Sequence, residues 1–219
     1  MPAQTASAHH IGNPIGLSQS RTASAGELVT FSSGQELPAE LNGVAFSAWR
    51  PSPFTPEAWA SVATSAIDFI EADVTPDANL AAEVIVVEPD SRVWMIHTSE
   101  ALGAKRLQFP HTKKDAQLSL QASAVRETWE KTGLKVGIKA VLGDIAEGDG
   151  TTRVYLATRV DGAPTMTGWE CPNVSLVPFS LLLQTGELLG ATVNKSILAA
   201  LNASLEMAQA MQEAQPSNS

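Results

Sequence analysis

The chain has 219 residues, of which 44% are hydrophobic and 17% charged, a composition typical of a folded globular protein. Its 14 Lys and Arg residues are outnumbered by 23 Asp and Glu residues, which gives a formal net charge of −9. Nucleic acids and anionic membranes attract basic surfaces, so this charge argues against both as partners. The single cysteine, Cys171, rules out an intramolecular disulfide and a zinc site built from several thiolates.

Hydropathy gives no sign of a membrane segment. No apolar run approaches the roughly 20 residues that a helix needs to span a bilayer. The first residues also lack the apolar centre of a signal peptide. We therefore expect a cytoplasmic protein.

The first 38 residues are rich in Ser, Thr, Ala, Gly and Gln and show no apolar periodicity. Such a segment has too little to bury to offset the entropy of ordering, so residues 1–38 are expected to form a disordered tail. Residues 39–214 are expected to form a single domain, with an N-terminal extension at 39–79, a core at 80–193 and a C-terminal helix at 194–214. The extension contains a predicted helix, "PEAWASVATSAIDFIEA", and aromatic residues that either anchor it on the core or stack on a substrate: Phe46, Trp49, Phe54 and Trp59.

The core starts with two β-rich runs, 83–87 and 93–97, and the sequence Glu88-Pro89-Asp90-Ser91 between them predicts a hairpin. A short strand, "KRLQFP", and an irregular stretch, "HTKKDAQ", come next. A helix is predicted from Ser119 to about Thr132. Ser119 suits its N-cap, and Gly133 suits the left-handed residue that ends it.

Two further strands, "KVGIKAVLGDI" and "TTRVYLATRV", are followed by a third, "VSLVPF", and a short helix, "SLLLQTG". Apolar residues repeat with helical periodicity through residues 194–214, which predicts an amphipathic helix. This order of strands and helices predicts an α/β protein of the α+β type, an α/β/α sandwich with a mixed β-sheet.

Charged residues cluster in "AVRETWEKTGL", residues 124–134. On a helix, Glu127 shares a face with Glu130 and with Lys131. Two carboxylates beside a loop that contains Lys113 suit Mg²⁺ and a phosphate chain, because Mg²⁺ takes oxygen ligands from one or two carboxylates, water and phosphate. Arg126 could pair with a neighbouring carboxylate. The alternative is an ordinary charged helix whose Glu, Arg and Lys side chains serve solubility.

The segment "LQFPHTKKDAQLSLQASAVRETWEKTGLKV" resembles the Nudix box, whose pattern is G-x5-E-x7-R-E-U-x-E-E-x-G-U, where U is an aliphatic residue. The box corresponds to residues 112–134, and five of its fixed positions match: Arg126, Glu127, Glu130, Gly133 and Leu134. The predicted elements before and after the box also agree, so the resemblance covers roughly residues 80–200. It implies a Nudix-like fold and a diphosphate (pyrophosphate) hydrolase of nucleoside-diphosphate-linked compounds, assisted by Mg²⁺ or Mn²⁺.

The resemblance also implies roles for single residues. The catalytic residues would be Glu127, Glu130 and Arg126, and the metal would be held by Glu127, Glu130 and Glu170 of "GWEC". Substrate phosphates would contact His111, Lys113 and Lys131. The implied partner is a small phosphorylated or nucleotide substrate, and a homodimer is a possibility because family members are often dimers.

Three departures from the box pattern bear on activity: Thr112 replaces its first glycine, Leu118 its first glutamate and Lys131 the second glutamate of its E-E pair. A lysine at a ligand position would repel a divalent cation by several kcal/mol. Lys131 could turn away and leave Glu127 and Glu130 to hold one weakly bound metal, or pair with Glu127 and contact phosphate itself, or mark an inactive site.

We therefore expect a Nudix-type hydrolase with weakened activity. The alternative is a catalytically impaired Nudix domain that serves as a nucleotide-binding, regulatory or interaction module. A third hypothesis is an interaction protein that functions through its tail and C-terminal helix.

Overall fold

The computed structural model describes residues 26–65, 79–98, 107–164, 171–185 and 194–213. The strands are β1 (Val29–Ser32), β2 (Glu40–Leu41), β3 (Val44–Ala45), β4 (Leu80–Val87), β5 (Arg92–His97), β6 (Leu107–Gln108), β7 (His111–Lys113), β8 (Leu134–Glu147), β9 (Gly150–Gly162) and β10 (Asn173–Pro178). The helices are α1 (Pro56–Ser65), α2 (Leu120–Thr132), α3 (Phe179–Thr185) and α4 (Lys195–Glu213).

Eight of these strands form one mixed sheet with the order β1-β10-β5-β4-β9-β8. The strands β6 and β7 lie off this path and pair with β5 and β4. Only β4 and β9 run parallel to each other; the other paired neighbours are antiparallel. The strands β2 and β3 form a separate two-stranded hairpin.

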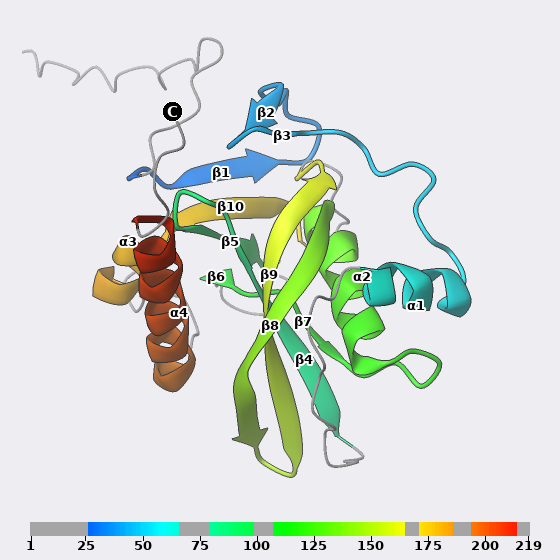
Figure 1. Cartoon of the computed structure of the whole chain (residues 1–219). Helices are drawn as coiled ribbons and strands as arrows, with labels where there is room; N and C mark the ends of the chain where they lie inside the picture. The colour runs from blue at the N-terminus through cyan, green and yellow to red at the C-terminus, as the bar shows by residue number, and fades with distance from the viewer. Residues whose placement is uncertain (1–25, 66–78, 99–106, 165–170, 186–193, 214–219) are drawn as a thin grey trace, which may run out of the picture.

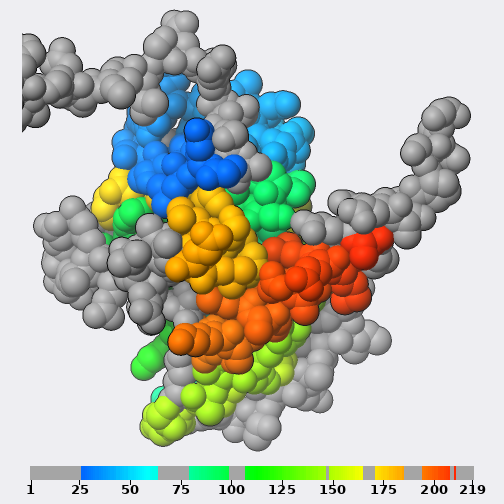
Figure 2. Space-filling view, turned by 90° about the vertical axis from the view of Figure 1, so that its left-hand side faces the viewer, coloured from blue at the N-terminus to red at the C-terminus, as the bar shows by residue number. Residues whose placement is uncertain are grey.

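Helices cover both faces of the sheet, with α1 and α2 on one side and α3 and α4 on the other (Figure 1). Figure 2 shows α3 and α4 side by side on the second face, with β1 beside them and the β8–β9 hairpin below. The central strand β4 contributes side chains to a hydrophobic core on each face of the sheet. Its residues Val84 and Val86 belong to the core under α1 and α2, while Ile85 and Val87 belong to the core under α3 and α4. The predicted α/β/α sandwich with a mixed sheet is confirmed.

Two short strands differ from the predictions. β1 lies inside the segment that was expected to be a disordered tail, and it pairs with Asn173–Leu176 of β10. Phe31 supplies the reason, because its side chain is buried in the core on the α2 side. β7 lies in the stretch that was expected to be irregular, and it pairs with β4. Residues 1–25 and 66–78, which include the end of the predicted N-terminal helix, lie outside the described residues.

Three tryptophan rings join α1 to α2. Trp49 lies 5.6 Å from Trp59 and 6.1 Å from Trp129 between ring centroids, and Trp59 lies 5.7 Å from Trp129. Lys135 Nζ lies 4.9 Å from the centroid of the Trp49 ring. These contacts confirm that the N-terminal extension is anchored through aromatic residues. Phe54 was predicted to be a further anchor, but its side chain is 88% exposed and this prediction was wrong.

A buried ion pair joins the β2–β3 hairpin to the main sheet. Arg159 Nε of β9 lies 2.6 Å from Glu88 Oε1, and their side chains are 0% and 1% exposed. Glu88 also accepts hydrogen bonds from Trp94 Nε1 and Asn42 Nδ2. The Arg159 guanidinium donates to the backbone carbonyls of Leu41, Val44 and Ala45. Both charges are therefore compensated by several partners.

Two glycines fix the end of α2 against β9. Gly133 ends the helix with a φ of 72°, and the Ala163 N–H donates to its carbonyl. Gly162 has a φ of 97°, and a Cβ on it would lie 2.4 Å from the Gly133 oxygen. Only glycine allows β9 to approach this closely. The contact fixes the last turn of α2, which contains Glu130 and Lys131.

We predict that Arg159→Met destabilises the protein by about 3–5 kcal/mol, because Glu88 is then left as a buried charge without its main partner. Urea unfolding followed by circular dichroism measures the free energy. Arg153→Met is the matched control: Arg153 Nε lies 2.8 Å from Asp144 Oδ1, but Asp144 is 39% exposed and regains water when the arginine is lost. The control should lose about 1 kcal/mol or less. Equal losses in the two variants would contradict the prediction.

We also predict that Gly162→Ala destabilises the protein by more than about 2 kcal/mol, since strain at a positive φ adds to a backbone clash. Gly148→Ala is the control, because Gly148 has a φ of 61° but no heavy atom within 4 Å of an added Cβ. It should cost about 1 kcal/mol, from strain alone. Thermal unfolding of both variants compares the two effects, and a Gly162→Ala protein as stable as Gly148→Ala would argue against the close contact.

Candidate functional site

The helix α2 presents the charged cluster, and its ends agree with the sequence-based prediction. Ser119 is the N-cap, with its Oγ accepting from the Ala122 N–H at 3.1 Å. At the other end the Gly133 N–H donates to the Trp129 carbonyl at 2.7 Å. The inward side consists mostly of small residues, both apolar ones such as Ala124 and hydroxyl-bearing ones such as Thr128. The helix therefore packs closely on the sheet with its charged side chains on the face turned away from the core.

On this charged face, Lys131 pairs with Glu127. The Nζ atom lies 2.8 Å from Glu127 Oε1, and the Lys131 and Glu127 side chains are 24% and 13% exposed. Their spacing of four residues brings the two side chains together on one face of the helix. Of the three arrangements considered for Lys131, the structure shows the pair with Glu127. A cation thus already lies against the most buried carboxylate of the cluster.

Arg126 lies between two other carboxylates. Its Nη2 donates to Asp115 Oδ2 at 2.9 Å, and its Nε lies 3.7 Å from Glu130 Oε1. The expectation that Arg126 pairs with a neighbouring carboxylate is confirmed. Within the described parts of the chain, Arg126 Nε is the buried side-chain nitrogen that lacks a hydrogen-bond partner. Glu130 is about half exposed.

Asp115 was not selected from the sequence, yet it connects the β7–α2 loop to the helix. Its carboxylate accepts from the Gln117 backbone N–H at 2.7 Å, and its own N–H donates to Ser123 Oγ at 3.1 Å. The hydrogen bond from Gln117, followed by that from Arg126, holds the pKa of Asp115 below its usual value of 3.8. Asp115 is therefore ionised at neutral pH and keeps its attraction for Arg126.

His111 and Lys113 are separated from the charged face of α2 by the alternation of β7. His111 pairs with Glu83 and Lys113 with Ala81, whereas Thr112 between them pairs with Ala82. Ala82 lies in the core under α2, so Thr112 shares that face of the sheet and its two neighbours share the opposite face. His111 Nε2 lies 3.5 Å from Thr152 Oγ1 of β9. The structure therefore does not bring these two predicted substrate contacts together with Glu127 and Glu130.

Two departures from the box pattern are accommodated by the fold. Thr112 is part of a strand and is not among the residues with positive φ, so a β-branched side chain suits this position. Leu118 is 5% exposed and packs in the core under α2. At this position an apolar contact with the core replaces the carboxylate of the pattern.

The described side chains do not fit a divalent metal site in this arrangement. Glu127 is paired with Lys131, and Glu130 lies beside Arg126. Within the ranges that the structure describes, no group of three or more His, Cys, Asp or Glu residues could hold a metal ion. Glu170, the third predicted ligand, lies outside the described residues. A metal at Glu127 would have to displace the Lys131 ammonium.

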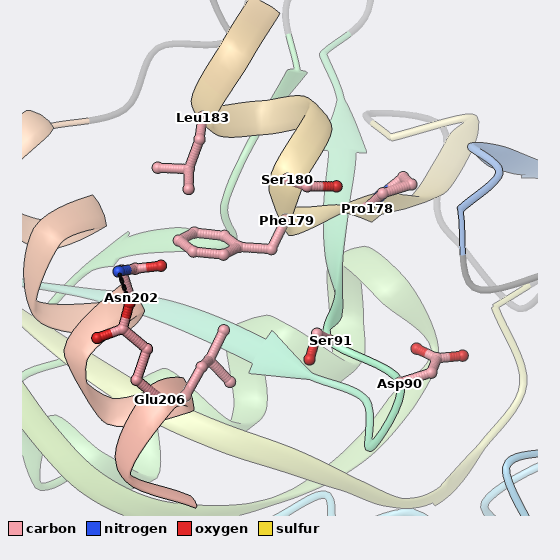
Figure 3. Close-up of a pocket in the computed structure, with 9 residues that line it drawn as sticks. Asp90, Ser91, Pro178, Phe179, Ser180, Leu183, Asn202 and Glu206 are labelled. Atoms are coloured by element: carbon pink, nitrogen blue, oxygen red, sulfur yellow. Dashed lines mark hydrogen bonds between the residues drawn. The ribbon is translucent and has the colours of Figure 1, made fainter. Parts of the chain in front are cut away.

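A separate pocket of about 210 Å³ lies between α3, α4 and the β4–β5 turn, on the other side of the sheet from α2 (Figure 3). Phe179 and Leu183 project into it from α3, opposite Asn202 and Glu206 of α4, which hydrogen-bond to each other at 2.8 Å. The described residues that line this pocket include no Lys, Arg or His, so they are poorly suited to phosphate. It does not contribute to the site on α2.

None of the helices within the described residues is both long and apolar enough to cross a membrane.

Solved structures of several hydrolases resemble part of the chain at low sequence identity. A NUDIX hydrolase from Nitrosomonas europaea is 10% identical to the chain, with a TM-score of 0.49 over 60% of this chain and 89% of that one. A hydrolase of the NUDIX family from Clostridium perfringens is 13% identical, with a TM-score of 0.49 over 61% and 99% of the two chains. An ADP-ribose pyrophosphatase from Streptococcus suis is 15% identical, with a TM-score of 0.46 over 57% and 91%. No curated protein matches the sequence.

The sequence itself identifies the family. Residues 78–200, more than half of the chain, match the family model of the NUDIX domain. This range runs from the start of β4 into α4 and contains α2 with all of its charged residues. The chain therefore belongs to the Nudix family.

Proposed function

We propose that this Nudix domain binds a small nucleoside-diphosphate-linked compound at the charged face of α2 and hydrolyses it only weakly. The observation that supports the proposal is the contact between Lys131 Nζ and Glu127 Oε1 at 2.8 Å. Metal-assisted hydrolysis of a diphosphate depends on a cation that orients the phosphates and activates the attacking water. An ammonium can neutralise charge, but it cannot lower the pKa of a bound water as a divalent metal does.

The charges around α2 support a phosphate-containing ligand. Lys131 and Arg126 lie on the face that Glu127 and Glu130 would otherwise make acidic, and the exposed Lys114 lies in the adjoining loop. These cationic groups near α2 matter because the whole chain has a formal net charge of −9, which repels a polyanionic ligand at long range. Binding would therefore depend on the cationic groups of this one region.

A second candidate is a nucleotide-binding or regulatory module without turnover. The same ion pairs favour it, because Glu127 has Lys131 as its cationic partner and Glu130 has Arg126. The two candidates share the ligand and differ in rate. In both candidates, the contribution of Glu170, the homodimer and the cytoplasmic location are further proposals, whereas His111 and Lys113 lie on the other face of the sheet from this site.

We predict slow release of mononucleotide from at least one of ADP-ribose, dinucleoside polyphosphates, NADH and nucleoside triphosphates in Mg²⁺ or Mn²⁺. Glu127→Gln should abolish this release, because it removes the most buried carboxylate of the site. Lys131→Glu should increase the rate by about tenfold or more, since it exchanges a repulsive charge for an additional ligand. Chromatography of the products measures all three rates.

Lys139→Glu provides the matched control, because it makes the same charge change at an exposed lysine of β8. The hydrolysis rate of Lys139→Glu should equal that of the wild type. A silent wild type together with an active Lys131→Glu variant would support the second candidate instead. If every variant is silent and calorimetry detects no nucleotide binding, both candidates fail.

A further inference from the structure

We propose that the Lys131 ammonium is a built-in cation, so that the site holds a diphosphate without any divalent metal. The inference rests on the proposed function, because it concerns how the same site on α2 binds that ligand. It assigns Lys131 as the phosphate-binding group and Glu127 as the residue that orients it.

The position of Lys131 supports this assignment. Glu127 holds Nζ at 2.8 Å, and both side chains are largely covered by the protein, so the ammonium has a defined place. Lys131 is still 24% exposed, which leaves it within reach of a ligand from solvent. An ammonium carries three N–H donors and can therefore serve a carboxylate and a phosphate oxygen together. The last turn of a helix also favours a positive charge.

The charge balance gives a second argument. A carboxylate carries one negative charge and an ammonium one positive charge. The replacement of the pattern's glutamate by Lys131 therefore raises the local charge by two units, the charge of one divalent cation. A diphosphate that approaches α2 would meet the same net charge that a carboxylate with a bound Mg²⁺ would present.

The neighbouring ion pairs keep this charge in place. Asp115 and Glu130 both lie beside Arg126, at 2.9 Å and 3.7 Å from its nitrogens, so each has a cationic neighbour other than Lys131. Arg126 thus lies between two carboxylates other than Glu127. Each carboxylate of the cluster thus lies beside a cationic group, Lys131 for Glu127 and Arg126 for Asp115 and Glu130.

The experiment measures binding of the non-hydrolysable diphosphate α,β-methylene-ADP by calorimetry, once with EDTA and once with Mg²⁺. For the full-length wild type we expect dissociation constants that agree within about threefold in the two conditions. Lys131→Met keeps the length of the side chain without its charge and should weaken binding by about tenfold or more in both. Lys131→Glu should bind the nucleotide in Mg²⁺ and lose it in EDTA.

Mn²⁺ alone gives a readout that does not depend on the nucleotide. Paramagnetic resonance should show that Lys131→Glu binds Mn²⁺ about tenfold more tightly than the wild type, because a carboxylate then replaces a repulsive charge. Lys139→Met and Lys139→Glu, on β8, should behave as the wild type in both measurements. Circular dichroism and thermal unfolding confirm that each variant is folded.

The outcomes separate this inference from the proposed function. If the wild type binds the nucleotide only in Mg²⁺, or if Lys131→Met binds as tightly as the wild type, Lys131 is not the built-in cation, although the ligand class stands. If neither this nucleotide nor any compound of the hydrolysis panel binds in either condition, the proposed function fails and the inference fails with it.

Discussion

The buried ion pair between Glu88 and Arg159 determines how the N-terminal hairpin, the β4–β5 turn and β9 meet. Removal of two charges from water costs several kcal/mol for each ion, and their mutual attraction offsets this only when the remaining donors and acceptors are also paired. Here Trp94 and Asn42 donate to Glu88, and backbone carbonyls of the β2–β3 hairpin accept from Arg159. The hairpin must therefore be in place for the charge on β9 to be tolerated.

This constraint extends to the candidate site. The hairpin leads into the segment that contains Trp49 and α1. The rings of Trp49 and Trp59 then pack against Trp129 of α2. At the end of α2, the contact between Gly133 and Gly162 ties the last turn of the helix to β9, the strand that also contains Arg159. The helix that presents Glu127 and Lys131 is thus fixed from two directions, by the N-terminal extension and by the sheet.

Local signals in the sequence predicted the elements well. Ser119 and Gly133 marked the ends of α2 because capping depends on a few adjacent residues, and the pair of Glu127 with Lys131 was among the arrangements expected from helical spacing. The layered architecture followed from the order of the elements, since β4 is apolar on both faces and needs helices over each.

Non-local pairing explains what the sequence did not show. β1 becomes a strand because it pairs with β10, more than 140 residues away, whereas the segment around it has the composition of a tail. β7 likewise depends on β4, and its register decides that His111 faces away from α2. Asp115 is one of many acidic residues in the sequence, and only the folded loop brings it to 2.9 Å from Arg126.

The two ion pairs of Glu88 with Arg159 and of Glu127 with Lys131 respond differently to substitution because they differ in exposure. The first is 0–1% exposed, so the loss of either partner leaves a charge that water cannot reach. The second is 13–24% exposed, and its members can regain part of their hydration. A change at Lys131 should therefore alter the charge of the site far more than the stability of the fold. This difference would allow a single residue of a Nudix helix to change from an anion to a cation while the domain that presents it stays intact.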